Sequence, residues 1–195
     1  MATSTLDRTA PTDVPVLDVL AGRWSPRAFE ATSPIDEHKL SAALEAARWS
    51  PSAYNAQPWR FLVGRRGSEL HERIHAALTG FNRSWAGDAA VLIVAIAETQ
   101  SADGTAITHA GYDLGQAVAH LSIQAHHDGL FAHQMSGFEP EAMRTVVPLE
   151  DRFAPMTVIA LGELGDAGKL SEVLQQRDVA PRVRRPLSET VLANS

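Results

Sequence analysis

The longest apolar run in the chain, residues 89–97 (AAVLIVAIA), sets the strongest constraint on the fold. It has about half the length of a membrane-spanning helix, so it does not predict a transmembrane segment. The run shows no alternation of polar and apolar residues and is partly β-branched, which is typical of a strand buried on both faces. Any fold for this chain must therefore cover both sides of that strand.

Periodicity, capping residues and chain breakers predict the remaining elements. Further strands are expected over residues 60–63, 130–135 and 156–161. Helices are expected over residues 68–78, 108–128 and 140–146. A short helix capped by Asp13 should run to Leu20, and a longer helix capped by Asp36 should stop at residues 50–51. The chain is thus predicted to be an α+β protein.

The two ends of the chain differ from its middle. Residues 1–12 are rich in Thr, Ser, Ala and Pro and are expected to form a flexible arm. No internal repeat or linker interrupts residues 13–195, so they are expected to form one domain. After residue 161 the chain becomes polar and basic and ends in PRVRRPLSETVLANS. This tail has too few apolar residues to fold alone, and we expect it to lie against another surface, such as a partner subunit.

Charge and cysteine content exclude several classes of function. The net charge of −6 argues against a general nucleic-acid binder. The absence of cysteine excludes disulfides, thiolate metal sites and a catalytic thiol, and it fits a reducing compartment. The N-terminus lacks the cationic start and apolar stretch of a secretory signal, so a cytoplasmic location without membrane attachment is expected.

The predicted helix over residues 108–128 carries small residues four apart on one face: Gly111, Gly115 and Ala119. Each glycine inside a helix costs about 1 kcal/mol relative to alanine. A smooth stripe of this kind favours the close approach of another backbone or of a flat ring. Glycines without a function, simply tolerated at these positions, remain the alternative.

Two short segments offer candidate binding groups. In RWSPR, Arg23, Ser25 and Arg27 could converge on a phosphate or carboxylate, because a guanidinium donates two hydrogen bonds to one anion. In PSAYNAQPW, Ser52, Asn55 and Gln57 offer neutral donors and acceptors that match the edge of a heterocycle. Alone, the first segment is more typical of a solvated basic turn, and the second is equally compatible with an ordinary turn.

The segment HERIH, residues 71–75, has the H-E-x-x-H spacing of zinc proteases. On a helix His71 and His75 would share a face, with Glu72 as a base. No suitable third ligand follows, so a metal site is not expected here. Nor is one expected at His120 and His127, for which a surface or interface position is the simpler interpretation. The chain also lacks a Rossmann G-x-G-x-x-G and a P-loop.

Taken together, the segments resemble the nitroreductase family. That family has an Arg-x-Ser-x-Arg/Lys turn, a helix after Pro-Ile (here Pro34-Ile35) and a Pro-Ser-x-x-Asn-x-Gln-Pro-Trp loop, all present at suitable spacing. The likeness continues through the glycine-bearing helix, the Ser136-Gly137-Phe138 turn and the RVRRP tail. Many members carry an acidic residue where this chain has Ser136. The resemblance implies a mainly antiparallel central sheet flanked by helices, with the C-terminal tail extending onto the partner of a homodimer.

The resemblance also implies an FMN site at the dimer interface. It assigns to the cofactor twelve residues: Arg23, Trp24, Ser25, Arg27, Ser52, Asn55, Gln57, Met135, Ser136, Gly137, Arg182 and Arg184. The arginines other than Arg27 would hold the phosphate end, and Arg27 the pyrimidine end. A backbone N–H of the turn at residues 135–137 would lie near flavin N5. Residues 52–57 would come from the partner subunit.

The implied activity is two-electron reduction of nitro, quinone or similar small acceptors by NADH or NADPH, in a ping-pong order. No residue of the chain is then expected to act as a catalytic acid or base, because flavin N5 carries the chemistry. Alternatives are an FMN-dependent oxidase or dehydrogenase that desaturates a small substrate, and a flavin-binding protein without turnover. The sequence does not distinguish NADH from NADPH, nor does it identify the substrate or a lid over the flavin.

Overall fold

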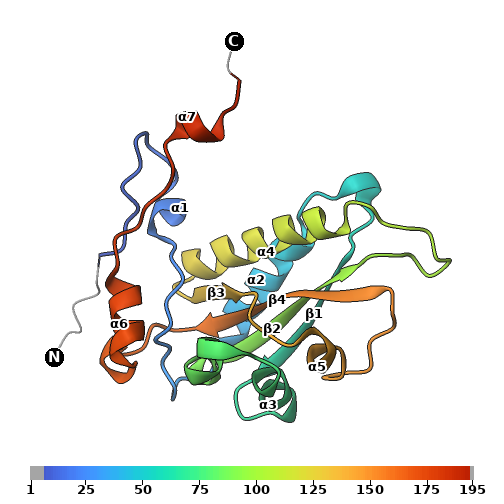
Figure 1. The fold of residues 1–195 in the computed structure, drawn as a ribbon, viewed down its shortest axis with the longest axis horizontal. Helices are drawn as coiled ribbons and strands as arrows, with labels where there is room; N and C mark the ends of the chain where they lie inside the picture. Colours follow the sequence, from blue (N-terminus) through green and yellow to red (C-terminus); the bar gives the residue numbers. More distant parts are fainter. Residues whose placement is uncertain (1–6, 194–195) are drawn as a thin grey trace.

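A four-stranded antiparallel sheet forms the centre of the computed structural model, which describes residues 7–193 (Figure 1). The strands are β1 (Trp59–Arg65), β2 (Val91–Glu98), β3 (Phe131–Met135) and β4 (Phe153–Gly162), in the spatial order β1-β2-β4-β3. The predictions of four strands and of a mainly antiparallel sheet are therefore confirmed.

Strand β2 is buried along its whole length, as its apolar run predicts. Successive side chains point to opposite faces of a strand. Val91 and Ile93 accordingly pack in one apolar layer, and Leu92 and Val94 pack in the other. The two layers are the two halves of the core, one on each side of the sheet.

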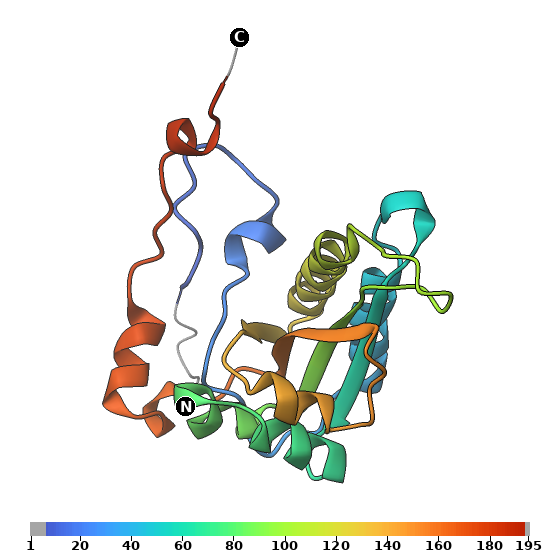
Figure 2. The same ribbon diagram turned by 45° about the vertical axis from the view of Figure 1, so that its right-hand side comes forward.

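Helices cover both faces (Figures 1 and 2). One layer contains α2 (Glu37–Arg48) and α4 (Ala110–His127); the other contains α3 (Glu69–Ala76), α5 (Pro140–Arg144) and the short turns η2 (Gly80–Ser84) and η3 (Ala86–Asp88). The Asp36 carboxylate accepts hydrogen bonds from the backbone N–H groups of His38 and Lys39, which confirms the predicted cap of α2. Across residues 7–193, no helix combines the length and apolar character that crossing a bilayer requires.

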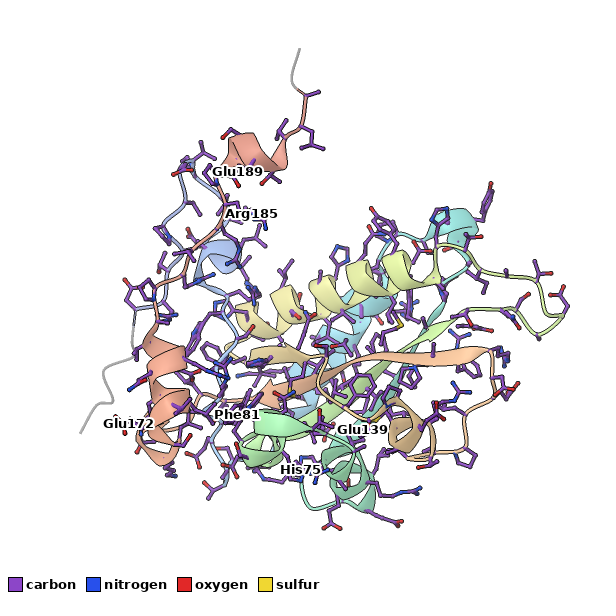
Figure 3. All side chains as sticks on the ribbon, in the orientation of Figure 1. His75, Phe81, Glu139, Glu172, Arg185 and Glu189 are labelled. Atoms are coloured by element: carbon purple, nitrogen blue, oxygen red, sulfur yellow. The ribbon has the colours of Figure 1, made fainter. Side chains whose placement is uncertain are left out.

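The two ends of the chain lie together beyond the β3 edge of the sheet (Figures 1 and 2). They contain α1 (Asp18–Gly22), α6 (Glu172–Val179) and α7 (Leu187–Thr190), with η4 (Ala167–Lys169) before α6. The Arg182 guanidinium joins the ends, because it donates to the carbonyls of Arg8, Ala21 and Arg23. The tail then carries Arg185 and Glu189 away from the sheet (Figure 3).

Two expectations for the N-terminal region have different outcomes. The predicted cap at Asp13 is wrong: α1 begins at Asp18 after Leu17, and Asp13 lies in an exposed bend. Nothing in the apolar spacing distinguishes this short helix from the extended segment before it. Of the expected arm, residues 1–6 lie outside the described residues, and residues 7–12 contain no helix or strand.

A close contact between two segments fixes the chain that follows α1. Phe29 pairs with Leu164 in an isolated bridge, and the N–H of Gly165 donates to the carbonyl of Ala28 at 3.0 Å. A β-carbon on Gly165 would clash with the Phe29 backbone and lie 2.8 Å from the nitrogen of Glu30. Only glycine fits where these two backbones meet, and the contact fixes residues 28–30, which directly follow the RWSPR segment, beside residues 163–165 after β4.

We therefore expect Gly165→Ala to lower the free energy of unfolding by about 1–3 kcal/mol, the usual cost of overpacking. Urea denaturation followed by circular dichroism measures it. Gly168→Ala is the matched control, because its β-carbon would meet no backbone atom and only the Asp166 side chain, 3.1 Å from Oδ1. That variant should stay within about 0.5 kcal/mol of wild type; equal losses would contradict the packing argument.

Candidate functional site

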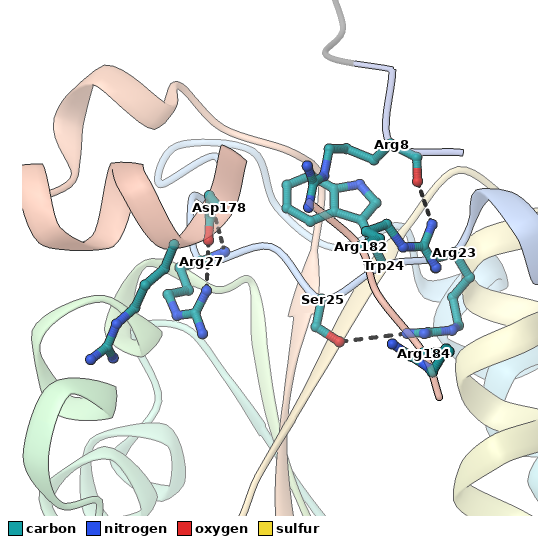
Figure 4. A pocket seen from close by; sticks show the side chains of 9 residues that line it. Arg8, Arg23, Trp24, Ser25, Arg27, Asp178, Arg182 and Arg184 are labelled. Carbon is teal, nitrogen blue, oxygen red and sulfur yellow. Dashed lines mark hydrogen bonds and ion pairs between the residues drawn. The ribbon is translucent and has the colours of Figure 1, made fainter. Parts of the chain in front are cut away.

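Arginines from both ends of the chain surround a cavity of about 150 Å³ beside β3 (Figure 4). Its lining residues are Arg8, Arg23, Trp24, Ser25, Arg27, Arg177, Asp178, Arg182 and Arg184. The structure thus brings together all six site residues predicted from the RWSPR segment and the basic tail. It adds Arg8, Arg177 and Asp178, which sequence reasoning missed.

The one carboxylate in this lining is already paired. Asp178 accepts a hydrogen bond from the Arg27 guanidinium at 2.8 Å and another from the Arg27 backbone N–H at 3.0 Å. Burial lowers the pKa of Arg23, and the charge of Arg184 lowers it further. Burial also lowers the pKa of Arg182, as do Arg23, Arg184 and Arg8. An anion in the cavity would relieve this repulsion and gain charge-assisted hydrogen bonds.

The arginine side chains of the cavity differ in how many of their N–H groups already donate hydrogen bonds within the protein. The Arg23 guanidinium lies 3.5 Å from the Ser25 hydroxyl, a long contact that leaves it available. The Arg182 guanidinium is largely committed to backbone carbonyls. Arg8 stacks on Trp24 and donates to the carbonyl of Ala180, while its buried Nε has no hydrogen-bond partner among the described residues. The Trp24 ring packs edge-on against Phe131, so its side chain supports the cavity wall.

The turn after β3 offers two unused backbone donors. The carbonyl of Gly137 accepts from the Thr79 N–H at 3.0 Å and from the Asn82 amide at 3.2 Å. A β-carbon on Gly137 would lie 2.7 Å from the Asn82 amide nitrogen, so a larger residue there would displace the Asn82 side chain that holds the turn. Within residues 7–193, the N–H groups of Ser136 and Gly137 donate no hydrogen bond. The turn is therefore held in place while its amides stay available to a ligand.

The predicted polar loop, residues 52–57, has a strained backbone around η1 (Ala53–Asn55). Tyr54, Asn55 and Gln57 all have positive φ, at 55°, 55° and 49°. Each such residue costs about 1–3 kcal/mol unless its surroundings fix it. The Gln57 N–H donates to the Ser52 hydroxyl at 3.1 Å, and the Ala53 N–H donates to the Asp113 carboxylate at 3.1 Å. These bonds hold the loop in a conformation that exposes the side chains of Asn55 and Gln57.

One chain keeps the two groups of predicted site residues apart, at opposite ends of α4. The loop contacts the first turn of α4 through Asp113, whereas a β-carbon on Gly22, next to Arg23, would lie 3.0 Å from His126 in the last turn. A helix of 18 residues is about 27 Å long. Each chain therefore holds the candidate site residues in two separate groups, called half-sites below: one at the arginine-lined cavity and the turn after β3, the other at the polar loop.

The zinc-like histidines are used in other contacts. His71 is buried, with Nε2 3.3 Å from the carbonyl of Ala89. His75, on α3 and outside the lining of the arginine-lined cavity, directs Nε2 to the carbonyl of Arg83 at 2.8 Å (Figure 3). Over residues 7–193, no group of three or more His, Asp or Glu residues is arranged to hold a metal ion.

His133 links the RWSPR segment to β3. Its Nδ1 lies 2.8 Å from the carbonyl of Pro26, and its ring packs against Trp85 with centroids 4.6 Å apart. Burial lowers the pKa of His133, the hydrogen bond to Pro26 opposes this, and the charge of Arg27 lowers the pKa again. The folded protein therefore takes up this proton at a lower pH than the unfolded chain, whose histidine pKa is about 6.5.

The stability that neutral His133 provides should be complete above about pH 6.5 and lost as the pH falls through the folded-state pKa. We expect His133→Phe to make the unfolding free energy less dependent on pH between about 7.5 and 5. Urea denaturation at a series of pH values measures this slope. His127→Phe, which changes an exposed histidine, should keep the wild-type slope. Identical slopes in wild type and His133→Phe would contradict the assignment.

Comparisons with known proteins identify relatives of this chain. The model of the nitroreductase family matches residues 20–84, which include both the RWSPR segment and the polar loop. A 15.4 kDa protein of Mycolicibacterium smegmatis is 36% identical over 137 residues, covering 67% of this chain and 92% of the relative. A Thermus thermophilus protein named NADH dehydrogenase is 27% identical over 213 residues, covering 92% of this chain and 97% of the relative.

Among solved structures, a crystal structure described as an oxidoreductase containing FMN is 34% identical to this chain. It superposes with a TM-score of 0.88 over 96% of each chain. This similarity extends well beyond residues 20–84, the segment that the family model matches. The chain belongs to the nitroreductase family.

Proposed function

We propose that the protein is an FMN-dependent oxidoreductase that uses NADH or NADPH to reduce small acceptors such as quinones or nitro compounds. One observation carries the proposal: a cavity with a large excess of arginine over carboxylate is joined through β3 to a turn with two free amides, because His133, two residues before that turn, lies 2.8 Å from the carbonyl of Pro26. A ligand with a phosphate at one end and a hydrogen-bonding ring at the other would satisfy both. The relatives described as containing FMN and as an NADH dehydrogenase support this choice.

In this proposal the residues of the cavity hold the cofactor by its charge. Arg23, Ser25 and Arg184 bind the phosphate, with Arg182 fixing the chain ends around it. Arg27, oriented by Asp178, faces the pyrimidine end of the flavin, where a cation stabilises the negative charge of the reduced ring. The backbone of residues 135–137 donates to the edge of the ring. FMN, when bound, accepts a hydride from the nicotinamide and supplies two electrons to the acceptor.

We further propose that two chains complete each site as a homodimer. Ser52, Asn55 and Gln57 would then reach the cofactor held by the partner, because their own chain keeps them at the far end of α4. The face of α4 with Gly111, Gly115 and Ala119 is exposed in one chain, and a β-carbon on Gly115 would meet nothing within 4 Å. Crossing of two such helices would bring opposite ends of α4 together and let the C-terminal tail extend onto the partner.

A chain without cysteine fits a reducing compartment, so we propose a cytoplasmic location.

Nicotinamide oxidation tests the activity. Protein incubated with FMN and freed of unbound flavin should consume NADH or NADPH when a quinone or nitroaromatic is added, with the parallel double-reciprocal lines of a ping-pong order. Bound flavin that neither nicotinamide reduces would instead indicate a flavin-binding protein without turnover. Flavin reduced by a small organic substrate and reoxidised by oxygen would indicate an oxidase.

Arg23→Ala tests the phosphate site. The variant loses a charge-assisted hydrogen bond worth about 1.5–3 kcal/mol, so its FMN dissociation constant should rise roughly 10- to 150-fold. Quenching of flavin fluorescence on binding measures the constant. Arg65→Ala is the control, since it removes an exposed arginine paired with Glu37 at 2.6 Å, away from the cavity. An unchanged affinity in Arg23→Ala would show that the cavity does not hold the phosphate.

Gly115→Leu tests the proposed dimer. The new side chain has free space within one chain, so far-ultraviolet circular dichroism should be unchanged. In a helix crossing it would overpack the interface by about 1–3 kcal/mol and weaken the dimer roughly 5- to 150-fold. Sedimentation over a concentration series measures this. Glu72→Leu on α3 adds an equally exposed leucine on the opposite side of the sheet and should leave association unchanged. A Gly115→Leu protein that associates like wild type would exclude this face.

A further inference from the structure

Asp113 connects the long helix to the strained loop. It lies in the first turn of α4 and is only 2% exposed. Its carboxylate Oδ2 accepts a hydrogen bond from the backbone N–H of Ala53 at 3.1 Å. Burial of a carboxylate is costly unless hydrogen bonds and nearby positive potential offset it. The N-terminal turn of α4 supplies part of that potential, and the Ala53 N–H supplies a bond.

The loop needs such an anchor at each end. Three residues with positive φ lie within residues 54–57, and the loop side chains there are exposed and pack on little else. At the exit of the loop, the Arg60 guanidinium donates to the carbonyl of Gln57 at 3.0 Å and is itself paired with the buried Glu98. At the entrance, Asp113 holds Ala53, between Ser52 and the first residue with positive φ. The two anchors fix the residues between them.

We infer that Asp113 is a positioning residue for FMN, and that it acts on the cofactor held mainly by the other subunit. The inference rests on the proposed function, because the loop carries Ser52, Asn55 and Gln57 to the partner's half-site. Asp113 does not itself touch the cofactor in this account. It keeps Ser52 and Asn55 in the conformation that binds, so that their ordering is complete before FMN arrives.

The positioning role of Asp113 is tested by substitutions that distinguish loss of its hydrogen bond to Ala53 from a general loss of stability. Asp113→Ala removes the acceptor and should raise the FMN dissociation constant about 10-fold or more, as expected for loss of a bond to a charged group. Asp113→Asn keeps an acceptor oxygen for the Ala53 N–H and should stay within about 3-fold of wild type. Asp36→Ala is the control, because Asp36 also accepts backbone N–H bonds in the first turn of a helix but lies away from the loop. It should lower the unfolding temperature without changing FMN affinity.

Mixed dimers test which subunit Asp113 serves. A dimer of one Arg23→Ala chain and one Asp113→Ala chain should contain one tight FMN site, since both defects then fall in the same site and the other is intact. If Asp113 served its own chain's cavity, each site would carry one defect and no tight site would remain. Titration of tag-purified mixed dimers with FMN counts the tight sites.

The outcomes separate this inference from the proposed function. Wild-type protein that binds no FMN, or binds it as a monomer, would overturn both. Tight FMN binding by wild type together with wild-type affinity in Asp113→Ala would overturn the positioning role alone. Equal weakening in the Ala and Asn variants would overturn the hydrogen bond to Ala53 as its basis, and mixed dimers without a tight site would overturn action on the partner.

Discussion

The burial of β2 on both faces determines where the candidate functional side chains lie. Helices cover both sides of the sheet, so its faces are occupied by apolar packing and have no room for a polar site. The groups that can bind a ligand therefore lie at the margins of the sheet. Arginines gather beyond the β3 edge, and the polar loop precedes β1 near the other end of α4. This arrangement explains why each chain presents two separated half-sites.

The arginine-lined cavity depends on the meeting of the two chain ends. Arg182 joins the segments around α1 to the tail through three backbone carbonyls, and Asp178 fixes Arg27 from α6. These bonds hold several guanidinium groups close together, and a bound anion would relieve the repulsion among them. The polar loop is likewise held in an unfavourable state by specific hydrogen bonds, because Asp113 and Arg60 stabilise its strained backbone. Both half-sites are thus preformed at the expense of local stability, which is typical of binding sites.

Local patterns in the sequence predict much of this fold. The apolar run identifies β2, and Asp36 and Ser68 mark the starts of α2 and α3, because an apolar run and a capping side chain can both be recognised within a few residues. The predicted cap at Asp13 is wrong because α1 has no buried residue, so no apolar face in the sequence marks where the helix starts. In the site, the spacing of RWSPR and PSAYNAQPW identifies candidate residues. Arg8 and Asp113 escape prediction, because their roles depend on contacts with residues far away in the sequence.

The central claim is that two copies of this chain together form each FMN site, and one measurement tests it most directly. Wild-type protein saturated with FMN is sedimented while protein and flavin absorbance are recorded separately. We predict that all bound flavin sediments with a dimer, at one FMN per chain, and that dilution releases flavin as the dimer dissociates. Flavin that stays bound to a monomer, or protein that sediments without flavin after incubation with excess FMN, would contradict the account.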